Sequence, residues 1–149
     1  MAATTRRHMA CSPEDVWAVL ADGWLYGLWV VGASRIRDVD PGWPDPDTRI
    51  HHSVGSWPLL LDDFTSVITA QAGRSLRLRA RAWPGGEADV LITIERTPTG
   101  CTVSITEDAV SGPGRYVPAP VRCTLLHYRN IESLQRLGYL AEHRQHGPL

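Results

Sequence analysis

Residues 121–143 read VRCTLLHYRNIESLQRLGYLAEH, and the expected fold of the rest of the chain follows from this stretch. At about 100° per residue, its apolar side chains fall on one helical face and its charged groups on the other. Prolines at 118 and 120 precede it and Gly147-Pro148 follow it, which predicts a helix from about Pro120 to His143. This helix needs an apolar surface to lie against, because one face consists of Cys123, Leu126, Leu134, Leu137 and Ala141.

Asn130 interrupts this apolar face, between Leu126 and Leu134. An amide buried there without a hydrogen-bond partner would cost roughly 1–3 kcal/mol. Two interpretations follow. The amide forms a structural hydrogen bond with a neighbouring backbone, or the surface beneath the helix is not entirely dry and the amide contacts a ligand or water.

Composition excludes several classes of protein. The chain has 149 residues, which predicts one domain over 1–149, and a net charge of −1 with both signs spread along it, which argues against nucleic-acid binding. Its three cysteines are far apart and form no CxxC pair, which indicates reduced thiols rather than a disulfide framework or a zinc site. No segment is apolar enough to span a membrane. We expect a soluble, cytoplasmic protein without a metal or cofactor.

The N-terminal third predicts one strand and two short helices. Residues 3–10 alternate as a strand would. Ser12 then provides an N-cap, Pro13 suits the first helical position, and Glu14 and Asp15 favour the positive end of the helix dipole. This first helix ends at Asp22-Gly23, and residues 24–31 form the second.

From residue 34 onward the period changes to two, as in strands. Leu76 and Leu78, for example, alternate with Arg77 and Arg79. An antiparallel sheet with one apolar face needs a cover, and only the last helix is long enough. The sequence therefore predicts an α+β fold, in which a curved antiparallel sheet of about seven strands wraps around a long C-terminal helix. After the first strand and the two short helices, we place six strands at 34–39, 48–54, 59–70, 76–82, 88–94 and 101–108.

This order of elements resembles the helix-grip superfamily of START, birch-pollen-allergen-like and polyketide cyclase/dehydrase domains (SRPBCC). The resemblance covers essentially the whole chain and rests on Ser12-Pro-Glu-Asp-Val-Trp17, Trp29, Ile105-Thr-Glu107, Ser111-Gly112 and the C-terminal helix. It implies a hydrophobic cavity between sheet and helix that binds lipids, sterols, polyketides or hormones. Some members catalyse cyclisation, dehydration or hydrolysis, and many only bind. Because the superfamily has no single catalytic signature, the resemblance transfers no catalytic residue.

Strand parity provides the titratable candidates. Glu107 shares a face with Val103 and Ile105, so it is either a carboxylate inside a pocket, able to act as a general acid or base, or a group that reaches water beyond the strand end. His52 shares a face with Ile50 and is either a cavity-wall histidine or a catalytic base.

Asp63 is the third titratable candidate. It points inward if Thr65 and Val67 do. An inward Asp63 beside His52 on the adjacent strand would form a carboxylate–imidazole pair that orients and charges the imidazole, and this pair is the sharpest catalytic hypothesis that the sequence offers.

Apolar and aromatic residues complete the predicted ligand-binding set. Five aromatic residues lie near strand or helix ends, where they would stack on a planar ligand or pack as core: Trp24, Tyr26, Trp29, Trp57 and Trp83. The four tryptophans among them enter the predicted site. The wall of the cavity is predicted to consist of Leu78, Val90, Ile92, Val103, Ile105, Leu126 and Leu134, with Asn130 as a polar contact.

Two functions remain open at this point. The first is binding of a hydrophobic or aromatic small molecule between sheet and helix. The second is a polyketide cyclase/dehydratase-type enzyme that uses His52, Asp63 and Glu107 as an acid–base set. A protein-interaction module fits less well, because the strand periodicity indicates no large exposed apolar patch. A homodimer is a further possibility.

Overall fold

Seven antiparallel strands form one curved sheet in the computed structural model, which describes residues 3–31, 33–54, 61–82 and 86–144. The strands are β1 (Ala3–Met9), β2 (Ala33–Val39), β3 (Arg49–Val54), β4 (Leu61–Gln71), β5 (Ser75–Ala82), β6 (Gly86–Thr97) and β7 (Gly100–Ser111). The helices are α1 (Pro13–Leu20), α2 (Tyr26–Trp29) and α3 (Ala119–His143), with the 3₁₀ turns η1 (Gly23–Leu25) and η2 (Pro113–Tyr116).

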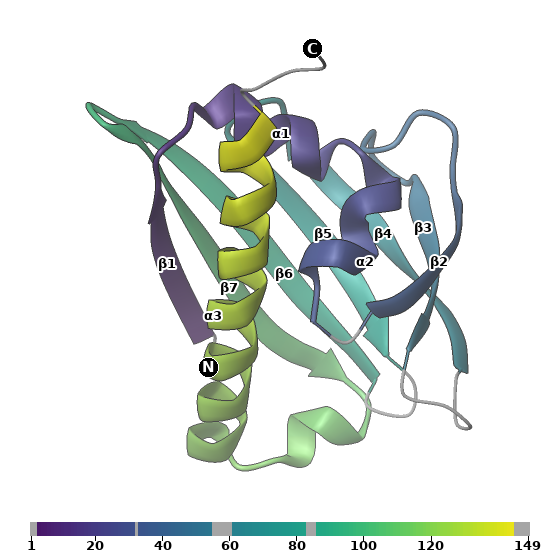
Figure 1. The fold of residues 1–149 in the computed structure, drawn as a ribbon. Coiled ribbons are helices and arrows are strands. Elements are labelled where there is room, and N and C mark those ends of the chain that lie inside the picture. The colour runs from purple at the N-terminus through teal and green to yellow at the C-terminus, as the bar shows by residue number, and fades with distance from the viewer. Residues whose placement is uncertain (1–2, 32, 55–60, 83–85, 145–149) are drawn as a thin grey trace.

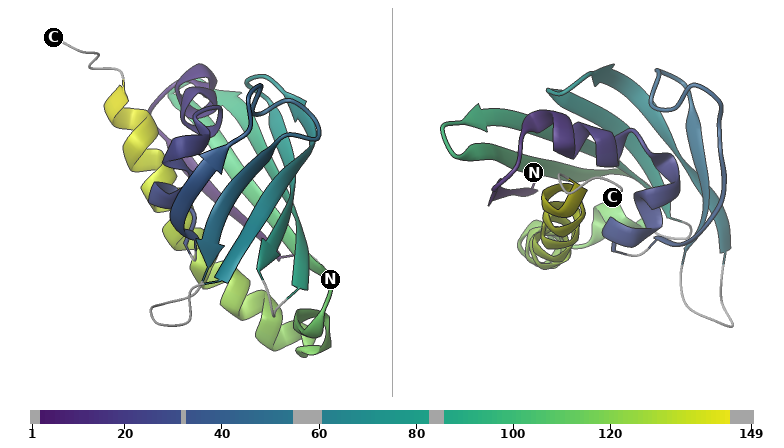
Figure 2. Two further views of the ribbon diagram at one scale, coloured as in Figure 1. Left: turned by 90° about the vertical axis from the view of Figure 1, so that its right-hand side faces the viewer. Right: turned by 45° about the horizontal axis from the view of Figure 1, so that its top comes forward.

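The strand order is β1-β7-β6-β5-β4-β3-β2, so the chain enters at one edge of the sheet and crosses to the other through α1 and α2. From β2 onward, each strand pairs with the next in sequence. The sheet bends around α3, and α1 and α2 cover the same side (Figures 1 and 2). The predicted helix-grip architecture is confirmed, and α3 begins within one residue of its predicted start.

Local signals in the sequence account for the helix boundaries. Ser12 Oγ accepts a hydrogen bond from the Asp15 amide at 3.1 Å, and the Asp15 carboxylate accepts one from the Ser12 amide at 3.2 Å. This capping box starts α1 with Pro13 in its first turn. The helix then buries Val16, Val19 and Leu20.

The last two strands are longer than predicted. β6 and β7 pair from Thr97–Gly100 at their hairpin as far as Glu87–Ser111, well beyond the apolar stretches at 88–94 and 101–108. Backbone pairing continues there without apolar side chains, because the partner strand supplies the hydrogen bonds whatever the side chains are. Residues 59–60 of the fourth predicted strand lie outside the described residues.

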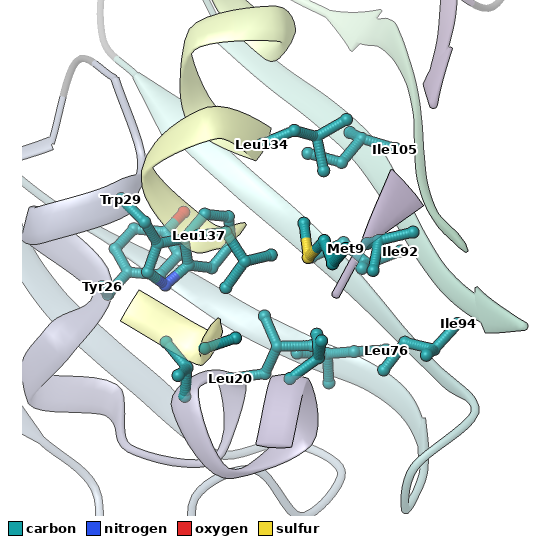
Figure 3. Packing of buried hydrophobic residues seen from close by; sticks show 14 of the residues in the cluster. Met9, Leu20, Tyr26, Trp29, Leu76, Ile92, Ile94, Ile105, Leu134 and Leu137 are labelled. Atoms are coloured by element: carbon teal, nitrogen blue, oxygen red, sulfur yellow. The ribbon is translucent and has the colours of Figure 1, made fainter. Parts of the chain in front are cut away.

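The core fills the inner face of the sheet near α1. Ile105, Ile92 and Leu76 stand side by side in register across β7, β6 and β5, and none is more than 2 % exposed. We call these three residues the large row. Leu134 and Leu137 of α3 pack over this region together with Met9 (Figure 3). Burying a side chain of this size contributes about 1.5–3 kcal/mol, so this half of the inner face carries much of the stability.

None of the three cysteines forms a disulfide, and Cys11 and Cys101 lie in the core. Burial raises the pKa of the Cys11 thiol to about 12, and the nearby Cys101 adds to the effect. Both therefore behave as small apolar side chains. Among the described residues, no helix is both long and apolar enough to cross a bilayer.

Candidate ligand-binding site

A second row of inner-face residues differs sharply from the large row. Ala109, Ala88, Ala80 and Thr65 are in register across β7, β6, β5 and β4. We call them the small row. Its three alanines are half-buried, whereas the side chains of the large row are fully buried. The inner face therefore changes, along the strands, from large apolar side chains to small ones that solvent can still reach.

Polar side chains surround the small row. Thr65, its last member, is fully buried, and its Oγ1 lies 2.8 Å from His52 Nε2 and 3.3 Å from the Tyr26 hydroxyl. The rings of Tyr26 and His52 stack at 5.8 Å with an 18° angle between their planes, and Trp29 packs edge-on against Tyr26. One hydrogen-bonded chain thus links α2 to two adjacent strands.

His52 lies on the inner face, as its strand parity predicts, and is 2 % exposed. Burial lowers the pKa of His52, and the opposing effect of the Asp63 charge does not offset it. The imidazole is therefore neutral at neutral pH. Its Nδ1 has no hydrogen-bond partner among the described residues.

Asp63 also points inward and stands opposite His52 in the β3–β4 register, whereas Asp62 is exposed. Its carboxylate accepts a hydrogen bond from the Phe64 amide at 2.9 Å and lies 3.4 Å from Arg81 Nε. The imidazole of His52 bonds to Thr65 instead. The two groups are thus adjacent, but the charged pair expected from the sequence is replaced by a neutral imidazole that threonine orients.

Glu107 is 5 % exposed and lies next to the small row, two residues before Ala109 on the same face of β7. It forms an ion pair with Arg129, which reaches back from α3 and keeps its side chain 39 % exposed. Burial raises the pKa of Tyr26; the charge of Glu107 adds to this effect, whereas the hydrogen bond with Thr65 and the charge of Arg129 oppose it. The ion pair and the Tyr26–Thr65–His52 chain therefore belong to one electrostatic environment.

Asn130 is 3 % exposed in the buried stripe of α3. Its Nδ2 finds no hydrogen-bond partner in the part of the chain that the structure describes. The neighbouring Ser133 is satisfied, because its Oγ accepts a hydrogen bond from the Val31 amide at 3.2 Å. A structural bond through the amide nitrogen, one of the two interpretations of Asn130, is therefore not seen. We call the following residues the polar cluster: Tyr26, His52, Asp63, Thr65, Glu107, Arg129 and Asn130.

The apolar candidates divide into two groups. Val90 and Leu126 are half-buried, and Val90 is the register partner of Glu107 beside the small row. The others belong to the closed core: Trp29, Leu78, Ile92, Val103, Ile105 and Leu134. Because these core residues are buried, they would support the ligand-binding surface from below rather than form its exposed wall.

The remaining tryptophans behave differently. Trp24 is 56 % exposed, so it is not core. With Trp43 it lines a hollow of about 450 Å³ at the end of α1, where Asp22 and Asp40 also lie. Trp57 and Trp83 lie outside the described residues.

Arg129 was missing from the predicted site, and Tyr26 appeared in the prediction only as an aromatic side chain near a helix end. Tyr26 lies in a four-residue helix, too short to show which side is buried. Arg129 is on the polar side of α3 by periodicity, and its long side chain folds back to Glu107. Within residues 3–31, 33–54, 61–82 and 86–144, no group of three or more His, Cys, Asp or Glu side chains is arranged to hold a metal ion.

Residues 1–137 match the family model for polyketide cyclase / dehydrase and lipid transport proteins. The chain belongs to this family. Its fold is shared by protein NE0264 from Nitrosomonas europaea, at a TM-score of 0.72 and 14 % identity over 98 % of this chain and 97 % of that one. No curated protein sequence matches the chain.

Two further solved structures share the fold. The di-domain ARO/CYC StfQ from the steffimycin biosynthetic pathway aligns at a TM-score of 0.74 and 11 % identity, over 97 % of this chain and 52 % of StfQ. Ara h 8.0201 aligns at 0.67 and 11 % identity, over 94 % of this chain and 97 % of that one. At such identities these structures establish the helix-grip fold, and membership in the family supports a general role in hydrophobic ligand binding or cyclisation.

Proposed function

We propose that the protein binds a hydrophobic or aromatic small molecule over the small row, with the polar cluster orienting it. The observation that carries this proposal is the combination of accessible alanines with buried, unpaired polar atoms on the same inner face. A purely structural core would fill such a surface with large apolar side chains and leave no polar group without a partner. Ligand sites have the opposite composition, apolar walls with a few placed polar groups.

Ala88→Phe tests this proposal. A phenyl group at the centre of the small row would occupy the space that the ligand needs, without removing any polar group. Native mass spectrometry of the gently purified protein, followed by extraction, should find a small apolar molecule on the wild type and lose it in this variant. Leu91→Phe is the matched control, because Leu91 lies on the opposite face of the same strand. An empty wild type that also shows no thermal shift with lipids, flavonoids or polyketides would refute the proposal.

A cyclase or dehydratase activity is the second candidate, and the Tyr26–Thr65–His52 chain favours it. The imidazole is neutral and held by Thr65, as a general base must be, and Asp63 and Glu107 lie on the same face. His52→Gln should then lower turnover of a poly-β-ketone by about 10²–10⁴-fold while ligand retention persists. Chromatographic analysis of the products measures this turnover. An unchanged rate would exclude the catalytic role and leave ligand binding as the function. The cytoplasmic location and the homodimer stay predictions of the sequence.

A further inference from the structure

The hollow at the end of α1 lies apart from the inner face and has a chemistry of its own. Its volume is about 450 Å³, within the range of small-molecule pockets. It lies where α1 and η1 meet the segment that follows β2, and both pass along the same end of the sheet (Figure 1). No member of the small row or of the polar cluster lines it. We call it the Trp24 hollow.

Two indole rings provide the apolar part of the Trp24 hollow. Trp43 is held in place, because its Nε1 donates a hydrogen bond to the Leu20 carbonyl at 3.1 Å. Its ring also rests against the backbone of Gly23, where a Cβ would come within 3.3 Å of Trp43 Cδ1 and 2.7 Å of Val39. Trp24, by contrast, leaves more than half of its surface exposed. An exposed indole beside a fixed one offers a face for an apolar group and for a cation.

The carboxylates of the Trp24 hollow give it a negative charge. Asp22 Oδ1 caps η1 by accepting a hydrogen bond from the Trp24 amide at 3.2 Å, and its Oδ2 has no partner in the described ranges. Asp40 is hydrogen-bonded to His51 Nε2 at 2.9 Å and to the Arg49 amide at 3.0 Å, and these bonds lower the pKa of its carboxyl. Both aspartates therefore carry a charge at neutral pH.

The C-terminal end of α1 adds to this field. Its carbonyls carry the equivalent of about half a negative charge, and its last turn has no basic residue to offset that charge. Ala18 and Ala21, in this turn and directly after it, line the hollow. None of the described lining residues is basic. Two carboxylates and a helix end thus surround the two indoles, and Asp22 has an oxygen available to accept a hydrogen bond.

We infer that the Trp24 hollow binds a small organic cation, a primary ammonium group on an apolar stem. Its N–H groups donate to Asp22 Oδ2, its charge lies over the exposed indole, and its stem packs against Trp43 and Pro41. An anion would be repelled by the two carboxylates, and a neutral group would leave Asp22 without a counter-charge. A basic protein segment would bury more surface than a hollow of this size provides. This site is separate from the proposed function of the inner face and does not depend on it.

Three probes with the same phenyl ring and two-carbon stem test the inference: phenethylamine, 2-phenylethanol and 3-phenylpropionate. NMR titrations of the ¹⁵N-labelled full chain report on each indole N–H separately, and Trp24→Phe identifies the Trp24 signal by its loss. At this signal, phenethylamine should show a dissociation constant about tenfold lower than that of 2-phenylethanol, as a partly exposed ion pair with a cation–π contact implies. The anion 3-phenylpropionate should leave the signal unshifted.

Three variants locate the cation. Asp22→Asn should reduce the preference for the amine to about threefold, because asparagine keeps the oxygen that caps η1 and removes the charge. Glu132→Gln removes the same charge from the surface of α3 and should leave the preference unchanged. Ala88→Phe, which fills the small row, should also leave it unchanged.

The opposite results would overturn the inference. These are equal binding of the amine and the alcohol at Trp24, an intact preference in Asp22→Asn, or an equal loss of preference in Glu132→Gln. Loss of the preference in Ala88→Phe would mean that the amine binds on the inner face, which excludes the hollow as its site. Tighter binding of a lysine-rich peptide than of phenethylamine would assign the hollow to a protein partner and overturn the inference as well.

Discussion

The large row and the small row lie on the same face of the same three strands, four residues apart along each strand, yet they have opposite compositions. Ile105, Ile92 and Leu76 are closed under the helices. Ala109, Ala88 and Ala80 are only partly buried, and buried polar groups adjoin them. The strand backbone imposes the same spacing on both rows, so the difference lies in the side chains alone. One half of the inner face is close-packed core, and the other half carries small, partly buried side chains beside buried polar groups.

The most direct test of this difference in packing is to exchange residue sizes between the rows. Leu76→Ala should lower the free energy of unfolding by about 2–5 kcal/mol, because it removes buried apolar volume that its neighbours cannot refill. Ala80→Leu, four residues further along β5, should cost less than about 1 kcal/mol, because it enters a space that is not close-packed. An overpacked core would instead lose about 1–3 kcal/mol. Urea denaturation measures both, and equal losses would show that the two halves are packed alike.

The ion pair between Glu107 and Arg129 provides a test of the burial of the polar groups. Arg129→Ala leaves a buried carboxylate without its partner, which we expect to cost about 1–3 kcal/mol, below the loss for a fully buried pair because the guanidinium is partly exposed. Adding Glu107→Gln to this variant should recover part of the loss. Denaturation curves for the single and double variants give the coupling.

The surface pair Arg136–Glu132 is the matched control for this experiment, since both of its side chains are about half-exposed on the same helix. Arg136→Ala should change the stability by less than about 0.5 kcal/mol. A similar loss in both arginine variants would show that Glu107 is solvated rather than part of a buried cluster.

Local patterns were sufficient to predict the elements and several inward-facing residues. Helical periodicity places Asn130 in the buried stripe of α3, and strand alternation places His52 and Glu107 on the inner face. The same pattern favours Asp63 over its neighbour Asp62 only on the condition that Thr65 and Val67 point inward, because adjacent residues of a strand lie on opposite faces. Only the pairing of β4 with β3 identifies Asp63 as the inward residue.

The small row could not be read from the sequence, because it exists only across strands. Its alanines come from β5, β6 and β7, and only the register aligns them. Each looks unremarkable within its own strand. The contact from Arg129 to Glu107 likewise depends on how closely α3 approaches β7, and helical periodicity does not predict this distance. The elements of the site are therefore local properties of the sequence, whereas its arrangement is a property of the packing.

The smallest effect that we predict is a dependence of stability on pH. Burial lowers the pKa of His52 below its ordinary value of 6.5, against the pull of Asp63 and with smaller contributions from Arg37 and His51. Below that pH the unfolded chain takes up a proton that the folded protein resists, so the free energy of unfolding should fall as the pH drops from about 6.5. The carboxyls of Asp40 and Asp89 have lowered pKa values and titrate below 3.8, outside this window.

His52→Gln should flatten this slope below about pH 6.5, because the unfolded chain then loses the group whose protonation the native state resists. His143→Gln is the control, since His143 is exposed at the end of α3, and it should leave the slope unchanged. Urea titrations at several pH values measure both. If His52→Gln leaves the slope intact, the imidazole can protonate in place, which would require water or an acceptor at Nδ1. The polar half would then be wet and already satisfied, and its contrast with the large row would be one of hydration rather than of unfilled hydrogen bonds.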